Sequence, residues 1–335
     1  MQLWEDRTAN KNKLIYIAII TFFIMFISLF VGRFNIPIMK FINGFNLNEM
    51  EKSVFYYIRL PRILLVMGVG AALSVAGASY QSIFRNPLVS PDILGVSAGA
   101  SFGAALGMIL SFQSFTSIYL LAFIFGVAAV LMTTFIARLA KTNMIMMMVL
   151  SGIVVGSLFN AFISILKYMA DPYEKLPGIV FWLMGGFSRT GWDELKFAAP
   201  FIIIGIIILI LIRWYLNVMS MGEEEAISMG VNVKLVRRVL VLFSTLMVAA
   251  SVATVGQVSW VGLVVPHIAR FIVGADHRYM VPASGLLGAS FLLLMDDIAR
   301  SLTGAEIPIS IITALLGAPF FAYLLISQKN SGWNR

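Results

Sequence analysis

Long apolar runs recur along the whole chain, and they constrain its fold more than any other feature. A helix of roughly 18 or more apolar residues is long enough to cross the hydrocarbon core of a bilayer. The sequence is 60% hydrophobic and only 12% charged, whereas a soluble domain carries about 25% charged residues. It therefore predicts an all-α polytopic membrane protein, with residues 1–335 forming a single transmembrane domain.

We place ten membrane-spanning helices in this domain. Their approximate ranges are 13–31, 61–84, 93–111, 118–138, 144–168, 197–216, 239–256, 257–274, 281–300 and 307–327. Residues 170–196 are predicted to lie outside the membrane with a short surface helix near 176–185. Residues 222–238 are too charged for lipid and are predicted to form one or two short helices in water. Basic residues in the short loops place both termini in the cytoplasm, which makes 170–196 extracytoplasmic.

An internal repeat supports this topology. A shift of 179 residues aligns small residues and prolines, placing Ala71 on Ala250, Gly77 on Gly256, Pro87 on Pro266 and Gly95 on Gly274. The two copies are five spans apart, and an odd number of spans forces opposite orientations. The pattern is typical of the inverted repeats of transporters. The four-residue spacing of Gly95, Gly99, Gly103 and Gly107 predicts close helix packing.

The residues that enzymes need are largely missing. The sequence has no cysteine and no G-x-x-x-x-G-K-[ST] motif for binding ATP. We expect His267, directly after Pro266, to serve at a helix start, and His277 to be a solvated turn residue. The net charge of +8 is assigned to helix ends beside membrane lipid and not to a nucleic-acid surface. These observations predict a transporter with no metal or cofactor of its own.

The acidic residues identified within the spans are Asp296 and Asp297. They precede Arg300 by four and three residues, a spacing that places them on one helical face with it. A structural ion pair near the outer end of the ninth span explains both aspartates. An ion-coupled secondary transporter would need a free carboxylate in the membrane, so it stays as a remote alternative.

The segment 222–230 predicts a docking helix for a cytoplasmic protein. Three acidic residues open it, as a helix N-terminus favours, and Gly230 suits a helix C-terminus. Lipid-binding helices instead need a basic face. The candidate coupling residues are Gly222, Glu223, Glu224, Glu225, Ala226, Ile227, Met229 and Gly230.

With these features in place, the chain resembles the FecCD family of ABC transporter permeases over nearly its whole length. The matching stretches are RLPR (59–62), RNPL (85–88), LGVSAGA (94–100), LSG (150–152), WLMGGF (182–187), AISMG (226–230), VGLVVPHIAR (261–270), GADHR (274–278) and IPISIITALLGAPFF (307–321). The resemblance implies the BtuC-like (type II) importer fold in a prokaryotic plasma membrane. It also implies a homodimer, two cytoplasmic ATPase subunits and an extracytoplasmic substrate-binding protein.

Several site residues follow from the resemblance. Arg59, Arg62 and Arg300 match arginines that receive acidic residues of the binding protein. Asn86 and Leu88 match the cytoplasmic gate of the cobalamin permease. Ile145 and Met146 complete that gate at positions where this sequence departs from the cobalamin permease. We expect an iron–siderophore as cargo, because a path with few charges suits a large chelate; cobalamin, haem and molybdate-type oxyanions are the alternatives.

Overall fold

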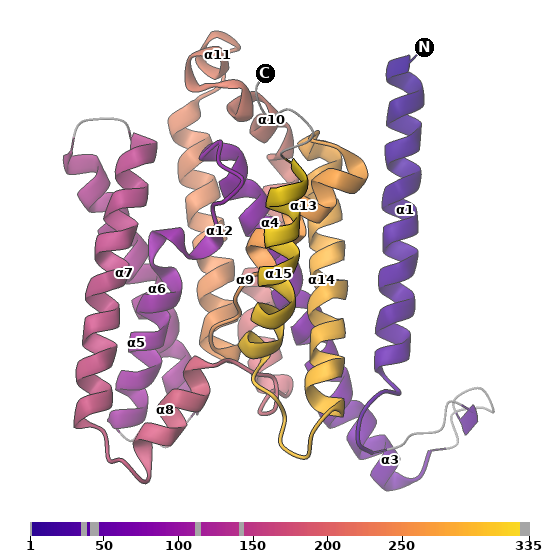
Figure 1. Ribbon diagram of the computed structural model, residues 1–335, viewed down its shortest axis with the longest axis vertical. Coiled ribbons are helices and arrows are strands. Elements are labelled where there is room, and N and C mark those ends of the chain that lie inside the picture. The colour runs from indigo at the N-terminus through magenta and orange to yellow at the C-terminus, as the bar shows by residue number, and fades with distance from the viewer. Residues whose placement is uncertain (1, 35–38, 41–46, 111–114, 141–143, 329–335) are drawn as a thin grey trace.

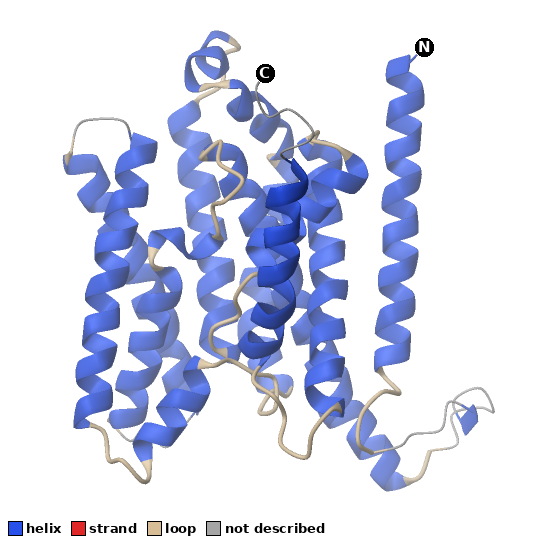
Figure 2. Cartoon of the chain, in the orientation of Figure 1, coloured by secondary structure: helices blue, strands red, loops and turns tan. Residues whose placement is uncertain are grey.

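The computed structural model describes residues 2–34, 39–40, 47–110, 115–140 and 144–328. Every regular element in these ranges is a helix (Figure 2). Seven helices are long and apolar enough to cross a membrane, and three shorter apolar helices accompany them. The predicted all-α class is confirmed, and the ten apolar helices of the described chain correspond to the ten predicted spans.

The bounds of these ten helices agree with the predicted ranges to within a few residues, except at the first, sixth and seventh spans. They are α1 Gln2–Ser28, α4 Leu60–Ile83, α5 Val96–Ile109, α6 Phe115–Leu139, α7 Met144–Met169, α9 Trp192–Leu211, α12 Val233–Val255, α13 Val261–Val273, α14 His277–Ser301 and α15 Ile309–Gln328. The predicted sixth span is divided, because the helix breaks at Ile212 and a second helix, α10, covers Arg213–Met221.

Short elements connect the long helices. The polar stretch before the second span ends in helix α3, Glu49–Ser53, and a π-helical turn η1, Val54–Arg59, which runs straight into α4. The remaining short elements are the 3-10 turn η2 Pro91–Leu94, the predicted surface helix α8 Lys175–Leu183, and α11 Glu223–Ser228. Figure 1 shows α3 and α8 at one end of the bundle and α10 and α11 at the other. These are called the α3 end and the α11 end below.

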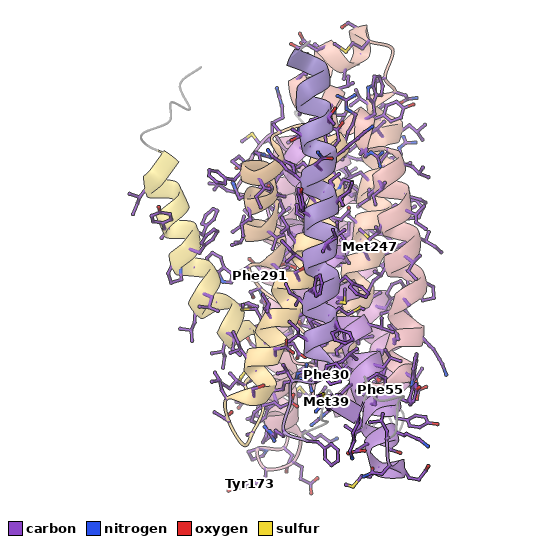
Figure 3. The ribbon with its side chains drawn as sticks, turned by 90° about the vertical axis from the view of Figure 1, so that its right-hand side faces the viewer. Phe30, Met39, Phe55, Tyr173, Met247 and Phe291 are labelled. Atoms are coloured by element: carbon purple, nitrogen blue, oxygen red, sulfur yellow. The ribbon has the colours of Figure 1, made fainter. Side chains whose placement is uncertain are left out.

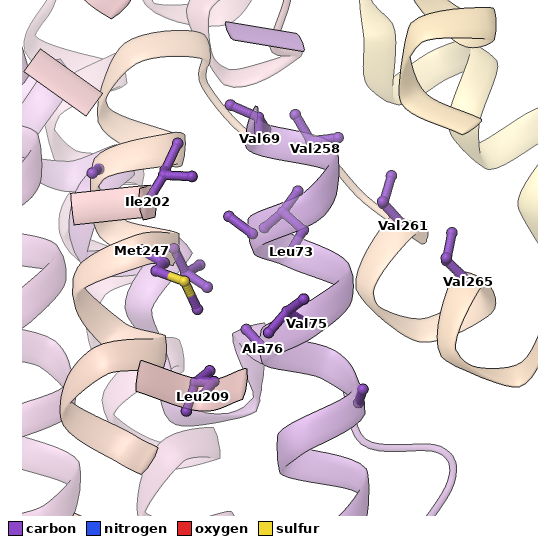
Figure 4. Packing of buried hydrophobic residues seen from close by; sticks show 14 of the residues in the cluster. Val69, Leu73, Val75, Ala76, Ile202, Leu209, Met247, Val258, Val261 and Val265 are labelled. Carbon is purple, nitrogen blue, oxygen red and sulfur yellow. The ribbon is translucent and has the colours of Figure 1, made fainter. Parts of the chain in front are cut away.

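Helix α4 lies at the centre of the bundle. Figure 4 shows Val69, Leu73 and Ala76 of α4 between Met247 of α12 and Val261 of α13, and all five side chains are buried. Lipid supplies no hydrophobic drive between helices, so close backbone packing must hold them together.

Small residues make this close packing possible. A Cβ atom on Gly70 would lie 2.2 Å from the carbonyl oxygen of Gly288 on α14, and one on Gly77 would lie 1.9 Å from that of Gly262 on α13. On α5, Gly99 and Gly103 meet backbone oxygens of α6 in the same way, at 2.4 Å each. The glycine series predicted to pack helices therefore does so.

The order of elements agrees with an inverted repeat. Helices α4 and α12 run in opposite directions, and each is followed by a break and a shorter helix, α5 or α13, that turns back (Figure 1). The predicted register is not reproduced, because Gly95 begins α5 whereas Gly274 ends α13. The starts of α4 and α12 are 173 residues apart and those of α5 and α13 are 165 apart. The helices of the two copies are therefore not related by a single shift of 179 residues.

Helix α15 stands away from the rest of the bundle. Figure 3 shows it leaning outward, with side chains projecting on both sides. Leu315 and Tyr323 are exposed on it, and Trp260 and His267 meet it through Phe321. A large apolar face therefore remains open to lipid or to another protein chain.

Candidate functional site

Arg62 is the centre of a charged network at the α3 end. Its Nε and Nη2 donate to the two oxygens of Asp296 on α14, at 3.0 and 2.8 Å. Its Nη1 and Nη2 also donate to the two oxygens of Glu306, both at 2.8 Å. One guanidinium thus joins α4, α14 and the connection to α15 through two bidentate pairs, the strongest arrangement for arginine and carboxylate.

Arg300 belongs to a second part of this network. Its Nη2 donates to Asp297 and, at 2.7 Å each, to the backbone oxygen and hydroxyl of Ser28 at the end of α1. Asp297 pairs with Arg300 as predicted, but Asp296 turns mainly to Arg62 and lies 3.9 Å from Arg300 Nε. The sequence separation of 234 residues between Arg62 and Asp296 explains why local spacing did not reveal this pair.

Arg59 completes the set of predicted docking arginines. Its Nη1 donates to the carbonyl oxygen of Leu29 at 2.6 Å and its Nη2 donates to that of Phe34. Arg59, Arg62 and Arg300 therefore cluster at one end of the bundle, as the resemblance implies. However, they are only 4%, 6% and 6% exposed, and groups of the same chain hold them.

Glu306 is the part of the network that reaches the surface, with a side chain 27% exposed. Burial alone would raise the pKa of this carboxyl, but the hydrogen bonds and charge of Arg62 outweigh burial and lower the pKa below its usual value. A cavity of about 160 Å³ opens beside it, lined by Arg62, Asp296, Arg189 and the aromatic rings of Tyr119 and Trp182 among others. A group entering this cavity would meet Arg62 next to Glu306.

At the α11 end, α11 combines a buried anchor with exposed apolar side chains. Ala226 is fully buried, whereas Ile227 and Met229 are 60% and 52% exposed. Gly230 adopts a φ of +79°, which suits the glycine predicted at this helix end. Glu223 pairs with the buried Arg237 of α12 at 2.9 Å. The sequence prediction of a short helix is therefore correct, although α12 takes over the second half of the charged segment.

The corner that carries α11 is tied to the core. Asn217 of α10 donates through Nδ2 to Asp276 at 2.7 Å, and its Oδ1 accepts from the backbone nitrogen of His277 at 2.8 Å. Ser82 of α4 donates to the backbone oxygen of Leu216 on α10 at 2.9 Å. Desolvation would raise the pKa of Asp276, but hydrogen bonds from Arg278 and Asn217 lower it to about 2. Helix α10, which leads directly into α11, is therefore joined to α4 and α14.

The two histidines differ from their predicted roles. His277 is 4% exposed, so it is a buried first residue of α14 and not a solvated turn residue. His267 lies inside α13, and its Nε2 is 2.9 Å from the carbonyl oxygen of Pro87. It therefore fixes the RNPL loop against α13 instead of starting a helix.

The predicted gate residues lie near the α11 end. Asn86, Ile145 and Met146 line a common pocket of about 290 Å³. The side chain of Asn86 accepts from the backbone nitrogen of Leu88 at 2.9 Å, and Leu88 is exposed outside that pocket. Three of the four gate residues therefore come together, and the fourth lies on the same turn.

A polar pocket between α5 and α7 was not predicted. It is lined by Asp92, Ser97, Asn160, Gln257 and Ser259, together with glycines and apolar residues. Asp92 takes part in none of the ion pairs described above. It accepts a hydrogen bond from Ser97. Two signals could have indicated it: an acidic residue at the start of the third span, and the spacing of Ser157, Asn160 and Ser164 on one face of α7.

The fold and these sites define a polytopic membrane permease. A family model described as the FecCD transport family matches residues 20–327, and the chain belongs to this family. The molybdate import system permease MolB of Haemophilus influenzae is 39% identical over 316 residues, which cover 92% of this chain and 93% of that protein. The hemin transport system permease HmuU of Yersinia pestis is 35% identical over 287 residues, with 84% and 86% covered.

A solved structure supports the same conclusion. It is described as an inward-facing conformation of a metal-chelate type ABC transporter, and it is 38% identical with a TM-score of 0.86. The match covers 94% of this chain and 98% of that one. The chain is therefore the membrane permease subunit of an ABC transporter, and a transporter subunit rather than an enzyme.

Proposed function

We propose that this permease imports an iron–siderophore, with ATP hydrolysed by two separate ATPase subunits at the α11 end. The observation that carries the coupling is α11 itself. Its exposed Ile227 and Met229 project from a short helix whose buried Ala226 and Glu223–Arg237 ion pair fix it to the bundle. A partner subunit that binds this apolar surface could transmit its own movement to the bundle, because α11 is firmly attached to it.

Hydrogen bonds at the α11 corner could carry such a movement from α10 to α4 and α14. Asn217 joins α10 to α14, and Ser82 joins α4 to α10. The RNPL loop follows α4 directly, so movement of α10 reaches the gate residues Asn86 and Leu88 through a packed helix. Ile145 and Met146 line the same pocket as Asn86. We assign these four residues to the cytoplasmic gate and both chain termini to the cytoplasm.

The α3 end then faces an extracytoplasmic binding protein. Arg59, Arg62 and Arg300 are the proposed recipients of its acidic residues, and such pairing mainly gives orientation and on-rate. Because Glu306 already occupies the outer side of Arg62, we propose that an incoming carboxylate takes its place. Glu306→Gln should therefore strengthen docking of the binding protein, whereas Glu49→Gln, at an exposed site on α3, should not.

Homodimerisation is part of the proposal. The exposed side of α15 and the exposed residues of α7, such as Ile153 and Leu158, are two apolar faces that no described part of the chain covers. A second copy would cover part of them and enclose a single path. The proposed location is the plasma (inner) membrane of a prokaryote.

The cargo proposal follows from the sparse charge of the apolar helices and from the relatives. Their names include iron chelatin, and also molybdate, cobalamin and hemin, so cobalamin, haem and a molybdate-type oxyanion stay as alternative cargoes. Uptake of iron-55-labelled siderophores and molybdenum-99-labelled molybdate by cells that carry the complete transporter would distinguish the siderophore from the oxyanion. Uptake of molybdate alone would overturn the siderophore proposal.

Coupling is tested by placing a charge on α11. Ile227→Asp and Met229→Asp should each abolish co-purification of the ATPase while leaving the permease folded. Met50→Asp is the matched control, since Met50 is an exposed apolar residue at the α3 end. Ala226→Asp would also disrupt coupling, but it buries a charge and so cannot separate coupling from folding. Full ATPase binding by both surface variants would contradict the role of α11.

A further inference from the structure

The polar pocket between α5 and α7 lies at the depth of the bilayer centre. Gly156, one of its lining residues, is close to the middle of the 26-residue helix α7, and thus about 18–20 Å from either helix end at 1.5 Å per residue. The pocket has a volume of about 410 Å³ and opens on the surface of the chain.

Two broken backbone segments meet at this pocket. Gly95 joins the turn η2 to α5 with a left-handed φ of +83°. The stretch 257–259 separates α12 from α13 and forms another wall. Irregular backbone at membrane depth is tolerated only where it is buried in protein or lines a water-filled cavity. Since Asp92 and Asn160 are exposed in the chain, the pocket cannot face lipid.

One ionisable side chain lines the pocket. Among the lining residues, all within the described chain, Asp92 alone is acidic or basic. Ser97, in the first turn of α5, donates a hydrogen bond to it. A helix N-terminus is where an oxyanion would ordinarily bind, and here the carboxylate of the chain itself is joined to that turn.

We propose that this pocket is a water-filled contact site for the cargo, in which Asp92 favours cationic or hydrogen-bond-donating chelates over oxyanions. Asn160, Gln257 and Ser259 supply further polar groups around the carboxylate. The inference rests on the proposed import function and narrows its cargo class. It also assigns a transport role to residues distant from the docking and gate sites.

A larger side chain at Gly156 can be used to fill the pocket. A Cβ atom at Gly156 would have no atom within 4 Å, whereas one at the neighbouring Gly152 would lie 2.0 Å from the carbonyl oxygen of Ile93. Gly156→Leu should therefore fill the pocket without disturbing the packing of α7. Gly178 on α8 is equally open, and Gly178→Leu is the matched control outside the pocket.

The absence of cysteine from the chain allows a direct chemical test. In the complete transporter, Asn160→Cys and Ser259→Cys should react with water-soluble methanethiosulfonate reagents, whereas Ile207→Cys on the outer face of α9 should not. The cationic trimethylammonium reagent should react roughly tenfold faster than the anionic sulfonate relative to a free thiol, as expected for a nearby unit charge at intermediate dielectric. Adding Asp92→Asn should remove this preference. Unreactive cysteines, or an unchanged preference, would overturn the proposal.

A transport experiment completes the test. In proteoliposomes that contain the permease, its ATPase and its binding protein, Gly156→Leu should reduce uptake of a labelled ferric siderophore at least tenfold while ATPase binding stays normal. Wild-type uptake by Gly156→Leu would sink the cargo-contact role alone. Failure of the unmodified permease to bind an ATPase would instead sink the proposed function, and the thiol chemistry would still decide whether Asp92 lies in a cation-selective aqueous pocket.

Discussion

The two ends of the molecule use their side chains in opposite ways. At the α3 end, Arg62 pairs with Asp296 and Glu306, and Arg300 pairs with Asp297. These charges are therefore neutralised within the chain. At the α11 end, a short helix holds apolar side chains out of the bundle. Charge at the α3 end therefore joins helices of the same chain, whereas the α11 end exposes apolar side chains that we propose as a surface for a partner. This difference also separates substitutions that unfold the chain from those that only uncouple it.

The largest effect is expected at the closed network. Asp296→Ala leaves Arg62 and Arg300 without their most buried partner, and breaking a buried ion pair costs about 3–5 kcal/mol. Thermal unfolding of the purified chain in detergent measures the loss. Asp193→Ala, at an exposed position in the first turn of α9, should have little effect. Equal stability of the two variants would show that the network does not maintain shape.

A smaller loss, with a larger functional consequence, is expected at the corner that carries α11. Asn217→Ala removes the hydrogen bonds that join α10 to Asp276 and His277, which should cost about 1–3 kcal/mol. We expect ATP-dependent uptake to fall while ATPase binding persists, because α11 remains intact but its route to α14 is weakened. Ser220→Ala on the same helix is the control. A variant that binds and transports normally would exclude this route.

The smallest effect is expected for Glu306→Gln at neutral pH, about 1 kcal/mol for a partly exposed pair. The pKa of Glu306 is lowered in the folded chain, so its contribution is present above the unfolded value of about 4.3 and is lost as pH falls through the folded pKa. The stability difference between wild type and variant should therefore persist from pH 7 to about pH 5 and shrink as the pH falls below about 4.3. A difference that is independent of pH would mean that the Arg62–Glu306 pair is not its origin.

Hydropathy was sufficient to place the long helices, because each must supply one continuous apolar run. It failed where that rule does not apply. The break at Ile212 and the early start of α12 at Val233 depend on α10 and α11 packing as an amphipathic corner. Equally, sequence could place Arg62 in the first turn of α4 but could not show its burial, since its partners are more than 230 residues away.

The functional residues divide in the same way. The proposed coupling helix could be located from sequence because its acidic start and terminal glycine are local features. The proposed docking arginines followed from the family motif, but their internal partners required the fold. Asp92 could not be identified from sequence because it lies at the edge of an apolar run. The fold brings η2, α7 and residues 257–259 together around it and so places it in a pocket at mid-depth.

The most direct test of the account is uptake into proteoliposomes. The permease is reconstituted with its ATPase and its binding protein, and labelled ferric siderophore is supplied on the side of the α3 end. The account predicts accumulation only when ATP is present on the side of the α11 end, and none when the ATPase is omitted or when the permease carries Met229→Asp. Accumulation by the permease alone, without ATP, would contradict it.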